Sequence, residues 1–406
     1  MFTNIKLAWR NLWRNKRRTL ITVASIFFGV LLSTIMSSMQ EGTYSSMIDN
    51  VVKFYSGYAQ IHDEEYWDEK TINNTFEYSG ELIKSVNGVE EVVHYTPRLE
   101  SFALASSETI TKGSLVMGID PIQEDKVTTV SKWINKGEYL KPGDLGVLVG
   151  IDLANYLQLD VGDTMVLISQ GYHGVSAAGK YPIRGLLKFG LPELNKQTVY
   201  MEISNCQEFY AAENRLTALV LMFKDQYALP KAMRKLDKVI GPPFSIKSWD
   251  IMQPEIVSQI EADRAGGLFM KALLYIIIGF GIFGTVMMMV SERKRELGVV
   301  IAIGMQRTKL SAILFYETIL IGVIGVLTGF AGSIPLIGYM VNNPIPLTGD
   351  AAKAMEDMGI EPAMYFSWAS SVFYNQVITI FVITALVAIY PVVRSQSFKL
   401  SLALRA

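Results

Sequence analysis

The chain has 406 residues, of which 50% are hydrophobic, and its 37 basic residues nearly balance its 38 acidic ones. A chain of this length could form two or three soluble domains with large cores. The distribution of the apolar residues excludes that arrangement, because they are concentrated in four long stretches that carry almost no charge. A single cysteine, Cys206, excludes an intramolecular disulfide, so every domain must be held together by its own core.

Residues 1–18 separate apolar and basic side chains onto different faces of a predicted helix. The apolar face comprises Ile5, Trp9, Leu12 and Trp13, and the basic face comprises Lys6, Arg10, Arg14 and Arg17. We expect an interfacial helix whose tryptophans lie among the lipid head groups and whose cations face anionic lipid. The alternative is a basic flank that only orients the following span.

Four segments are apolar over enough residues to cross about 30 Å of hydrocarbon. We predict transmembrane helices at 19–39, 268–290, 310–340 and 371–391. The first follows basic residues, as a signal peptide does, but its apolar stretch is longer than usual and no A-x-A cleavage site follows. We therefore expect it to be retained as a membrane span. Lys271, near one end of the second span, is expected to snorkel to the head groups.

The charges of the connecting segments predict the orientation in the membrane. Basic side chains precede the first span, occupy 291–309 and follow the fourth span in 392–406, so the positive-inside rule places these segments in the cytoplasm. The segment 40–264 has about ten more acidic than basic side chains, and the loop 341–370 is also acidic. We therefore expect a multi-pass inner-membrane protein with both of these segments outside and both termini in the cytoplasm.

The segment 40–264 predicts a large α+β extracytoplasmic domain of two subdomains. Strands at 58–62 and 91–95 flank a helix near 81–86, and strands at 218–223 and 244–249 flank a helix at 228–239. Short β runs at 164–169, 181–187 and 198–201 predict a second, β-rich subdomain at about 115–205. Helical spacing from Tyr44 to Tyr55 and from Glu255 to Glu261 predicts two stalks that continue the first and second spans.

The segment 291–309 joins the second and third spans and begins with the sequence SERKRELGVVIAIGMQR. Its charges permit pairs such as Glu292 with Arg295, and an apolar run separates Gly298 from Gly304. A short helix along the cytoplasmic surface would fit this pattern, and such a helix can bind in a groove of a soluble partner. The alternative is a charged connector that only anchors two spans.

This segment resembles the E-R-x-R-E-[IL]-G-x-x-x-A-[IL]-G coupling segment of the MacB/FtsX/Lol permeases, the type VII or mechanotransmission ABC transporters. Leu7–Thr19 is similar to the part of the family that precedes the first span, and Tyr390–Arg405 is similar to its P-x-R-R…A-L-R tail. The resemblance implies a role in ATPase coupling for Glu292, Arg293, Arg295, Glu296, Gly298, Gly304 and Met305. It also implies a separate cytoplasmic ABC ATPase dimer, which binds ATP and Mg, and a second permease copy or a paralogue.

Four stretches in the outer segment look more like the lipoprotein-releasing LolC and LolE permeases than like MacB: Pro97–Leu99, Gly118–Pro121, Leu159–Thr164 and Gly190–Leu194. This likeness implies release of lipoproteins from the inner membrane. In that group the loop at 171–179 can be a hook for a periplasmic carrier, with Tyr172, His173 and Val175 as candidate contacts. The loop lacks the prolines of such a hook, so a plain hairpin is the alternative. Two other functions stay open, MacB-like efflux of drugs or peptides and FtsX-like regulation of a cell-wall hydrolase.

No pattern of catalytic or metal-binding residues is present. The three histidines have no ligand spacing with Cys206, and no Ser/His/Asp grouping is discernible. The G-x-x-x-x-G-K sequence that begins at Gly174 continues with Tyr181 and Pro182, so it lacks the hydroxyl and the helix of a P-loop. We expect a transport subunit that interacts with membrane lipids, has no cofactor or catalytic residue, and binds no nucleic acid.

One acidic side chain, Glu317, lies within a predicted span. A carboxylate in the membrane is costly and is by default a candidate for function. The family resemblance favours a structural hydrogen bond to a neighbouring helix over a proton relay.

Overall fold

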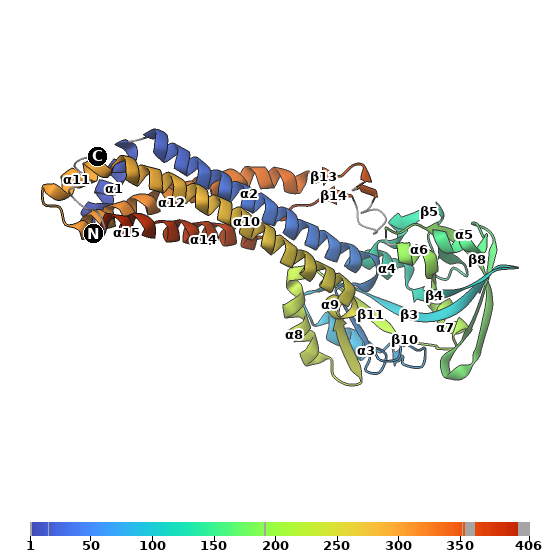
Figure 1. The fold of residues 1–406 in the computed structure, drawn as a ribbon. Helices are drawn as coiled ribbons and strands as arrows, with labels where there is room; N and C mark the ends of the chain where they lie inside the picture. Colours follow the sequence, from blue (N-terminus) through green and yellow to red (C-terminus); the bar gives the residue numbers. More distant parts are fainter. Residues whose placement is uncertain (1, 15, 191, 351, 354–361, 397–406) are drawn as a thin grey trace. The chain divides into compact units, whose positions relative to one another are not determined.

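The structure is a computed structural model that describes residues 2–14, 16–190, 192–350, 352–353 and 362–396 (Figure 1). It divides into two compact units. Unit 1 comprises Met1–Tyr44, Gln259–Pro346 and Ala363–Ala406, and unit 2 comprises Ser45–Ser258 and Leu347–Pro362. The end of the predicted basic tail, with Lys399 and Arg405, lies outside the described residues.

Unit 1 is built from helices. They are α1 (Phe2–Arg14), α2 (Lys16–Val51), α10 (Pro254–Glu292), α11 (Lys294–Ala302), α12 (Arg307–Asn342), α14 (Ser370–Val387) and α15 (Ile389–Gln396). In the described part of the chain, four helical segments are long and apolar enough to cross a membrane: α2, α10, α12 and α14 with α15. A small hairpin, β13 (Ile345–Pro346) with β14 (Ala363–Met364), lies between α12 and α14. The predicted membrane α-helical fold class is confirmed.

Two of these helices extend well past the apolar stretches that predicted them. Helix α2 continues to Val51, and α10 begins at Pro254, so each predicted stalk is continuous with its span. The fourth span covers the predicted 371–391 as two consecutive helices, α14 and α15, which Ala388 separates. Pro391 explains the separation, since it has no N–H to donate to the carbonyl of residue 387.

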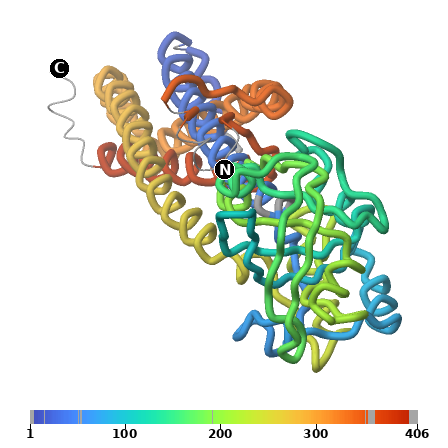
Figure 2. Tube along the Cα trace, turned by 90° about the vertical axis from the view of Figure 1, so that its right-hand side faces the viewer, coloured from blue at the N-terminus to red at the C-terminus, as the bar shows by residue number. Residues whose placement is uncertain are grey.

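The core of unit 1 lies where α2, α10, α12 and α14 meet, and includes Ile26, Ile282, Ile321 and Ile380. Helices α2 and α12 approach each other closely through glycines, a common device in membrane helix packing. A Cβ atom at Gly325 would lie 2.6 Å from Cβ of Ile26. By contrast, α10 exposes a long apolar side, with Phe280 at 71% exposure, and its gold tube lies at the edge of the helix group in Figure 2.

Helix α1 corrects one detail of the prediction. Ala8 and Leu12 are buried, and Leu12 belongs to the core of unit 1, whereas Trp9 and Trp13 are 45% and 46% exposed. The residues expected to form one lipid-facing side therefore divide between two directions. Leu12 packs inward because α1 lies against α12, whereas the two tryptophans remain exposed.

Unit 2 contains a ten-stranded sheet in the order β12-β1-β11-β3-β4-β9-β6-β8-β5, with β7 pairing to β3 and β8. The strands are β1 (Ala59–Asp63), β3 (Val92–Ser106), β4 (Thr111–Ile119), β5 (Ile134–Gly137), β6 (Val147–Gly150), β7 (Thr164–Gln170), β8 (Ser176–Leu187), β9 (Thr198–Glu202), β11 (Ala218–Phe223) and β12 (Phe244–Ser248). Two short strands, β2 (Phe76–Glu77) and β10 (Arg215–Leu216), pair separately.

The helices of unit 2 are α3 (Gly80–Asn87), α4 (Pro121–Thr128), α5 (Ile151–Leu157), α6 (Pro192–Gln197), α7 (Ile203–Phe209), α8 (Leu229–Val239) and α9 (Trp249–Met252). A π-helical turn, η1 (Val52–Ser56), follows α2 directly. The remaining turns are the 3-10 helices η2 (Val130–Trp133), η3 (Tyr172–Gly174) and η4 (Gln226–Ala228). The strands and helices predicted at both ends of this segment and in its middle are confirmed.

The sequence predicted two subdomains, whereas the structure joins their strands in one sheet. The reason is the length of β3, which has 15 residues. Its first half pairs with β11, from the outer part of the segment, and its last three residues pair with β7, from the middle. Strand β4 pairs along β3 from Arg98 to Ser106 and connects it to β9. Cys206 is fully buried in the core beneath this part of the sheet.

Candidate functional site

The segment 291–309 forms a short helix between two long ones. Arg293 has φ −90° and ψ 6°, which separates α10 from α11, and Gly304 has φ +106°, a conformation that favours glycine after a helix. Leu297 on α11 packs with Leu310 and Leu314 of α12 in a small hydrophobic cluster. Helix α11 therefore lies back against the start of α12.

Two ion pairs connect this segment to the N-terminal helices. Arg14 of α1 pairs with Glu296 of α11, and Arg18 of α2 pairs with Glu292 at the end of α10. The expected pair of Glu292 with Arg295 is therefore wrong, because Glu292 points to α2 instead. The position of Arg14 also corrects the expectation that every cation of the predicted basic face, Lys6, Arg10, Arg14 and Arg17, faces lipid. Each pair is partly exposed, so its contribution to stability is about 0–1 kcal/mol.

A third ion pair lies deeper. The Nη1 atom of Arg293 donates to both carboxylate oxygens of Glu317 on α12, at 2.8 and 3.1 Å. The Glu317 side chain is 2% exposed and that of Arg293 is 13% exposed. Nε of Arg293 also lies 3.5 Å from Glu296. The carboxylate in the span thus pairs with a residue of the segment 291–309.

The three pairs line one polar hollow of about 260 Å³, together with Asn11, Thr19 and Met289. A second hollow of about 580 Å³ adjoins it between α1, α11 and α12, and shares Arg14, Arg293 and Glu296 with the first. We call the three pairs, Arg14–Glu296, Arg18–Glu292 and Arg293–Glu317, the charge cluster. It connects α1, α2, α10, α11 and α12, and all six of its residues belong to unit 1.

The predicted coupling residues do not share one direction. Glu292, Arg293 and Glu296 belong to the charge cluster, Gly298 is buried, and Met305 packs against the Leu297 cluster. Arg295 and Gly304 are exposed and lie outside the charge cluster. Val299 and Ile303 are 41% and 82% exposed and were not predicted as site residues. Their spacing of four residues was the signal, since it places two apolar side chains on one face of a helix.

The second predicted site, the loop at 171–179, is a tight hairpin. Strand β8 already begins at Ser176, so Tyr172, His173 and Val175 form the turn between β7 and β8. The N–H of Tyr172 donates to the carbonyl of Tyr210 at 2.7 Å, and the N–H of His173 donates to Oδ1 of Asn73 at 2.8 Å. The turn is therefore held against the body of unit 2, although His173 and Val175 are exposed.

No group of three or more metal-ligating side chains occurs among the described residues. His62 is buried, its Nδ1–H donates to the carbonyl of Thr217 at 2.7 Å, and its ring stacks on Tyr66. Burial lowers the pKa of His62 to about 4, so it is neutral at physiological pH. The G-x-x-x-x-G-K sequence at Gly174 leads into strand β8 rather than into a helix, as its sequence predicted.

Comparison with known proteins assigns both parts of the chain. The MacB-like periplasmic core domain matches residues 19–239, more than half of the chain, and the FtsX-like permease C-terminal domain matches residues 268–398. The periplasmic region of MacB from Actinobacillus actinomycetemcomitans is 12% identical with a TM-score of 0.35, covering 52% of this chain and 97% of that one. The extracellular domain of the transporter YknZ from Gram-positive bacteria is 13% identical with a TM-score of 0.33, covering 47% of this chain and 98% of that one.

Curated relatives include permeases with two different names. The lipoprotein-releasing system transmembrane protein LolC of Xylella fastidiosa strain 9a5c is 27% identical, and the match covers 59% of each chain, so this chain spans less than two thirds of that relative. LolC of Neisseria meningitidis is 20% identical, covering 80% of this chain and 78% of the relative. The macrolide export ATP-binding/permease protein MacB 1/2 of Paracoccus denitrificans is 19% identical, and the match covers 82% of this chain and 50% of the relative.

The two domain matches occur in the order expected from the sequence, and they include the four apolar helices and the large sheet domain. The chain therefore belongs to the family of ABC transporter permeases that combine a MacB-like periplasmic core domain with an FtsX-like permease C-terminal domain.

Proposed function

We propose that this chain is the permease subunit of an ABC transporter that releases lipoproteins from the inner membrane, driven by a separate cytoplasmic ATPase. In this proposal the termini and α11 lie in the cytoplasm, and unit 2 lies outside. A second permease copy or paralogue completes the transporter. Hydrolysis of ATP, with its Mg, belongs to the ATPase, and this chain makes and breaks no bond.

The observation that carries the proposal is an exposed apolar pair on α11, a helix that is otherwise held in place. Arg293 and Glu296 connect the helix to the charge cluster, and Leu297 packs on α12. Val299 and Ile303 are exposed to solvent. An exposed pair of apolar residues on a short helix, flanked by the exposed Arg295, suits binding in a groove of a soluble protein.

The charge cluster gives such binding a way to act on the rest of unit 1. A displacement of the segment 291–309 by the ATPase would pull on Arg14, Arg18 and Glu317, and so on α1, α2 and α12. Helix α2 then continues without interruption to Val51, within unit 2. We infer that α2 transmits the movement to the outer domain, which pushes the cargo out of the membrane.

Lipoprotein as the cargo is supported by the relatives named for lipoprotein release, of which the Neisseria protein is matched over 78% of its length. The turn at Tyr172, His173 and Val175 is the proposed contact for a carrier, with only His173 and Val175 exposed enough to contribute. Because this turn is short, any such contact is small.

MacB-like efflux is the second candidate, and the similarity to MacB of Paracoccus denitrificans over 82% of this chain favours it. Regulation of a cell-wall hydrolase is the third candidate and shares the same coupling to an ATPase. These candidates differ in what the outer domain contacts.

Isolation of the complex from native membranes, followed by mass spectrometry, tests the proposal. We expect an ABC ATPase, two permease chains and acylated lipoprotein. A drug-efflux adaptor without lipoprotein would favour the MacB-like function, and a hydrolase without cargo would favour the regulator. Recovery of the chain without any ATPase would contradict the proposal.

A further inference from the structure

Unit 2 contains a buried group of charges that the proposed function has not used. Arg98, Glu100 and Glu124 are 0%, 7% and 0% exposed. The guanidinium carbon of Arg98 lies 5.5 Å from the centre of the Tyr55 ring. We call these four residues the arginine clamp. They come from three places in the chain: η1, strand β3 and helix α4.

Arg98 uses all three of its nitrogens. Nε and Nη2 donate to the two oxygens of Glu124 at 3.0 and 2.6 Å, which is a bidentate pair. Nη1 donates to the backbone carbonyl of Tyr55 at 2.6 Å and to Glu100 at 3.3 Å. The guanidinium thus binds a side chain on α4, a side chain on its own strand and the backbone of η1.

The carboxylates of the clamp are held in turn. The hydroxyl of Tyr55 donates to Glu100 at 2.8 Å. Thr96 and Thr128 donate to Glu124 at 3.1 and 2.7 Å. Each carboxylate therefore has a fixed direction.

Burial acts to lower the pKa of Arg98, but the carboxylates of Glu124 and Glu100 outweigh it, so the pKa is raised. Burial, and then the charge of Glu100, raise the pKa of the Tyr55 hydroxyl. Arg98 therefore stays a cation and Tyr55 stays neutral at any physiological pH, so the clamp does not act as a pH switch.

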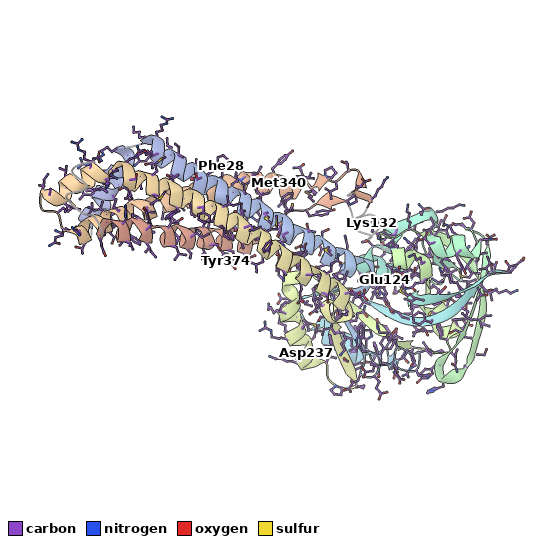
Figure 3. The ribbon with its side chains drawn as sticks, in the orientation of Figure 1. Phe28, Glu124, Lys132, Asp237, Met340 and Tyr374 are labelled. Carbon is purple, nitrogen blue, oxygen red and sulfur yellow. The ribbon has the colours of Figure 1, made fainter. Side chains whose placement is uncertain are left out.

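The location of the clamp is what suggests a role. Tyr55 belongs to η1, a π-helical turn that begins at Val52, directly after the last residue of α2. Such turns are rare and are frequent at functional sites. Helix α4 packs on η1, and Figure 3 labels Glu124 on α4 in the part of unit 2 where α2 ends. Arg98 therefore connects the end of α2 directly to the longest strand of the sheet.

Stability alone does not account for this arrangement. A buried ion pair is often no more stabilising than apolar side chains of the same volume. A guanidinium bound to two carboxylates and a carbonyl does, however, fix the relative orientation of the elements that carry these groups, because its donors form a rigid planar fork. Apolar contacts impose no such orientation.

We propose that the arginine clamp is a positioning device that fixes the end of α2 rigidly to the sheet, so that movement of α2 is passed to the outer domain. Arg98 is its central positioning residue. This rests on the proposed function, in which α2 transmits the movement.

The test measures the rigidity of this joint without any ATPase. The full chain in lipid nanodiscs carries spin labels at Asn50→Cys, in the last turn of α2, and at Lys180→Cys, on strand β8. Both positions lie in unit 2. Cys206 does not react, since it is buried and its burial raises the thiol pKa. Double electron–electron resonance spectroscopy then gives the distribution of distances between the two spin labels.

The main variant is Arg98→Met/Glu100→Gln/Glu124→Gln, which neutralises all three charges together and leaves no unpaired buried ion. We expect a distance distribution at least twofold broader than in the unsubstituted chain, with circular dichroism unchanged. The matched control is Glu91→Gln/Lys231→Met/Lys235→Met, which removes a three-residue ion cluster of the same unit. This control variant should leave the width of the distance distribution unchanged.

A distribution in the neutral variant as narrow as in the unsubstituted chain would overturn the proposal. If that variant fails to fold, Arg98→Lys serves instead, since it keeps the charge but loses the bidentate geometry. It should fold and broaden the distribution, and a normal width in the Arg98→Lys variant would equally count against the clamp.

A second measurement separates this proposal from the proposed function. In a transporter assembled with its ATPase, the neutral variant should hydrolyse ATP within twofold of the normal rate but release cargo at least tenfold more slowly. Normal release would overturn the clamp as a transmitting joint. If no ATPase binds the chain, the proposed function fails while the label distances still report whether the joint is rigid.

Discussion

Arg293 and Glu317 meet within unit 1, with Nη1 of the arginine 2.8 Å from Oε1 of the glutamate. They are 24 residues apart, and the glutamate is 2% exposed. Arg293 separates α10 from α11. Its contact with Glu317 therefore holds the junction of these two helices against α12. A paired carboxylate in this position supports a structural part for Glu317 rather than a proton relay.

The first prediction concerns this pair. Arg293→Met leaves Glu317 buried without its partner, and should lower the free energy of unfolding by about 3–5 kcal/mol. The double variant Arg293→Met/Glu317→Leu removes both charges, and should be more stable than the single one. Unfolding of both variants in the same detergent checks this. A double variant less stable than Arg293→Met would contradict the prediction.

The second prediction concerns Arg18 and Glu292. Glu292→Arg places two cations together and should decrease ATPase stimulation in the assembled transporter, while stability changes by about 1 kcal/mol or less because the pair is partly exposed. The exchange Arg18→Glu/Glu292→Arg restores an attractive pair. It should recover most of the stimulation. If Glu292 instead contacts the ATPase directly, the exchange will not recover it.

The third prediction concerns the exposed side of α11. Ile303 is 82% exposed, so Ile303→Glu costs little stability but places a charge where an apolar groove should bind. Binding of the ATPase, measured by co-purification, should fall at least tenfold. Ile122→Glu, at a 55% exposed position on α4 in unit 2, is the matched control and should bind normally. Normal binding of Ile303→Glu would exclude this side of α11 as the contact.

The fourth prediction concerns the close approach of α2 and α12. Gly325→Ala puts a methyl group 2.6 Å from Cβ of Ile26, so the helices must move apart, at a cost of about 1–3 kcal/mol. Gly281→Ala on α10 meets nothing within 4 Å and should be neutral. Thermal unfolding of both variants compares them directly. Equal unfolding midpoints for the two alanine variants would show that α2 and α12 are packed less closely than the structure indicates.

The fifth prediction concerns pH. The pKa of His62 falls from its ordinary 6.5 to about 4 in the folded protein, so the unfolded chain binds a proton that the folded one does not between these values. This contribution to stability is fully present above pH 6.5 and is lost as the pH falls toward 4, amounting to about 3 kcal/mol. Unfolding free energies of the chain and of His62→Gln, measured from pH 7 to 4, should converge at the acidic end. Parallel curves would contradict the assignment.

Local pattern in the sequence predicted the elements of this chain well. Apolar length predicted the spans, and alternation predicted strands such as Thr164–Gln170 and Phe244–Ser248. It did not predict that one sheet joins both parts of unit 2. The pairing of β3 with β7 at Leu104 and Ile168 depends on tertiary contacts, and nothing in either strand alone encodes its neighbour.

The candidate site shows the same limit. The family resemblance identified Glu292 and Glu296, but the charge spacing paired Glu292 with Arg295, because spacing reports only partners that are close in the sequence. Arg14 and Glu296 are 282 residues apart, and only the fold brings them together. The amphipathic pattern of α1 likewise could not show that Leu12 packs against a helix while Trp9 does not.

Helix α2 has 36 residues in one uninterrupted run. At 1.5 Å per residue such a rod is about 54 Å long, whereas the hydrocarbon layer is about 30 Å thick. Roughly 24 Å of it must therefore project beyond the lipid tails. A tilt of only about 5° around one tip would sweep the opposite tip through about 5 Å, comparable to the separation of adjacent strands.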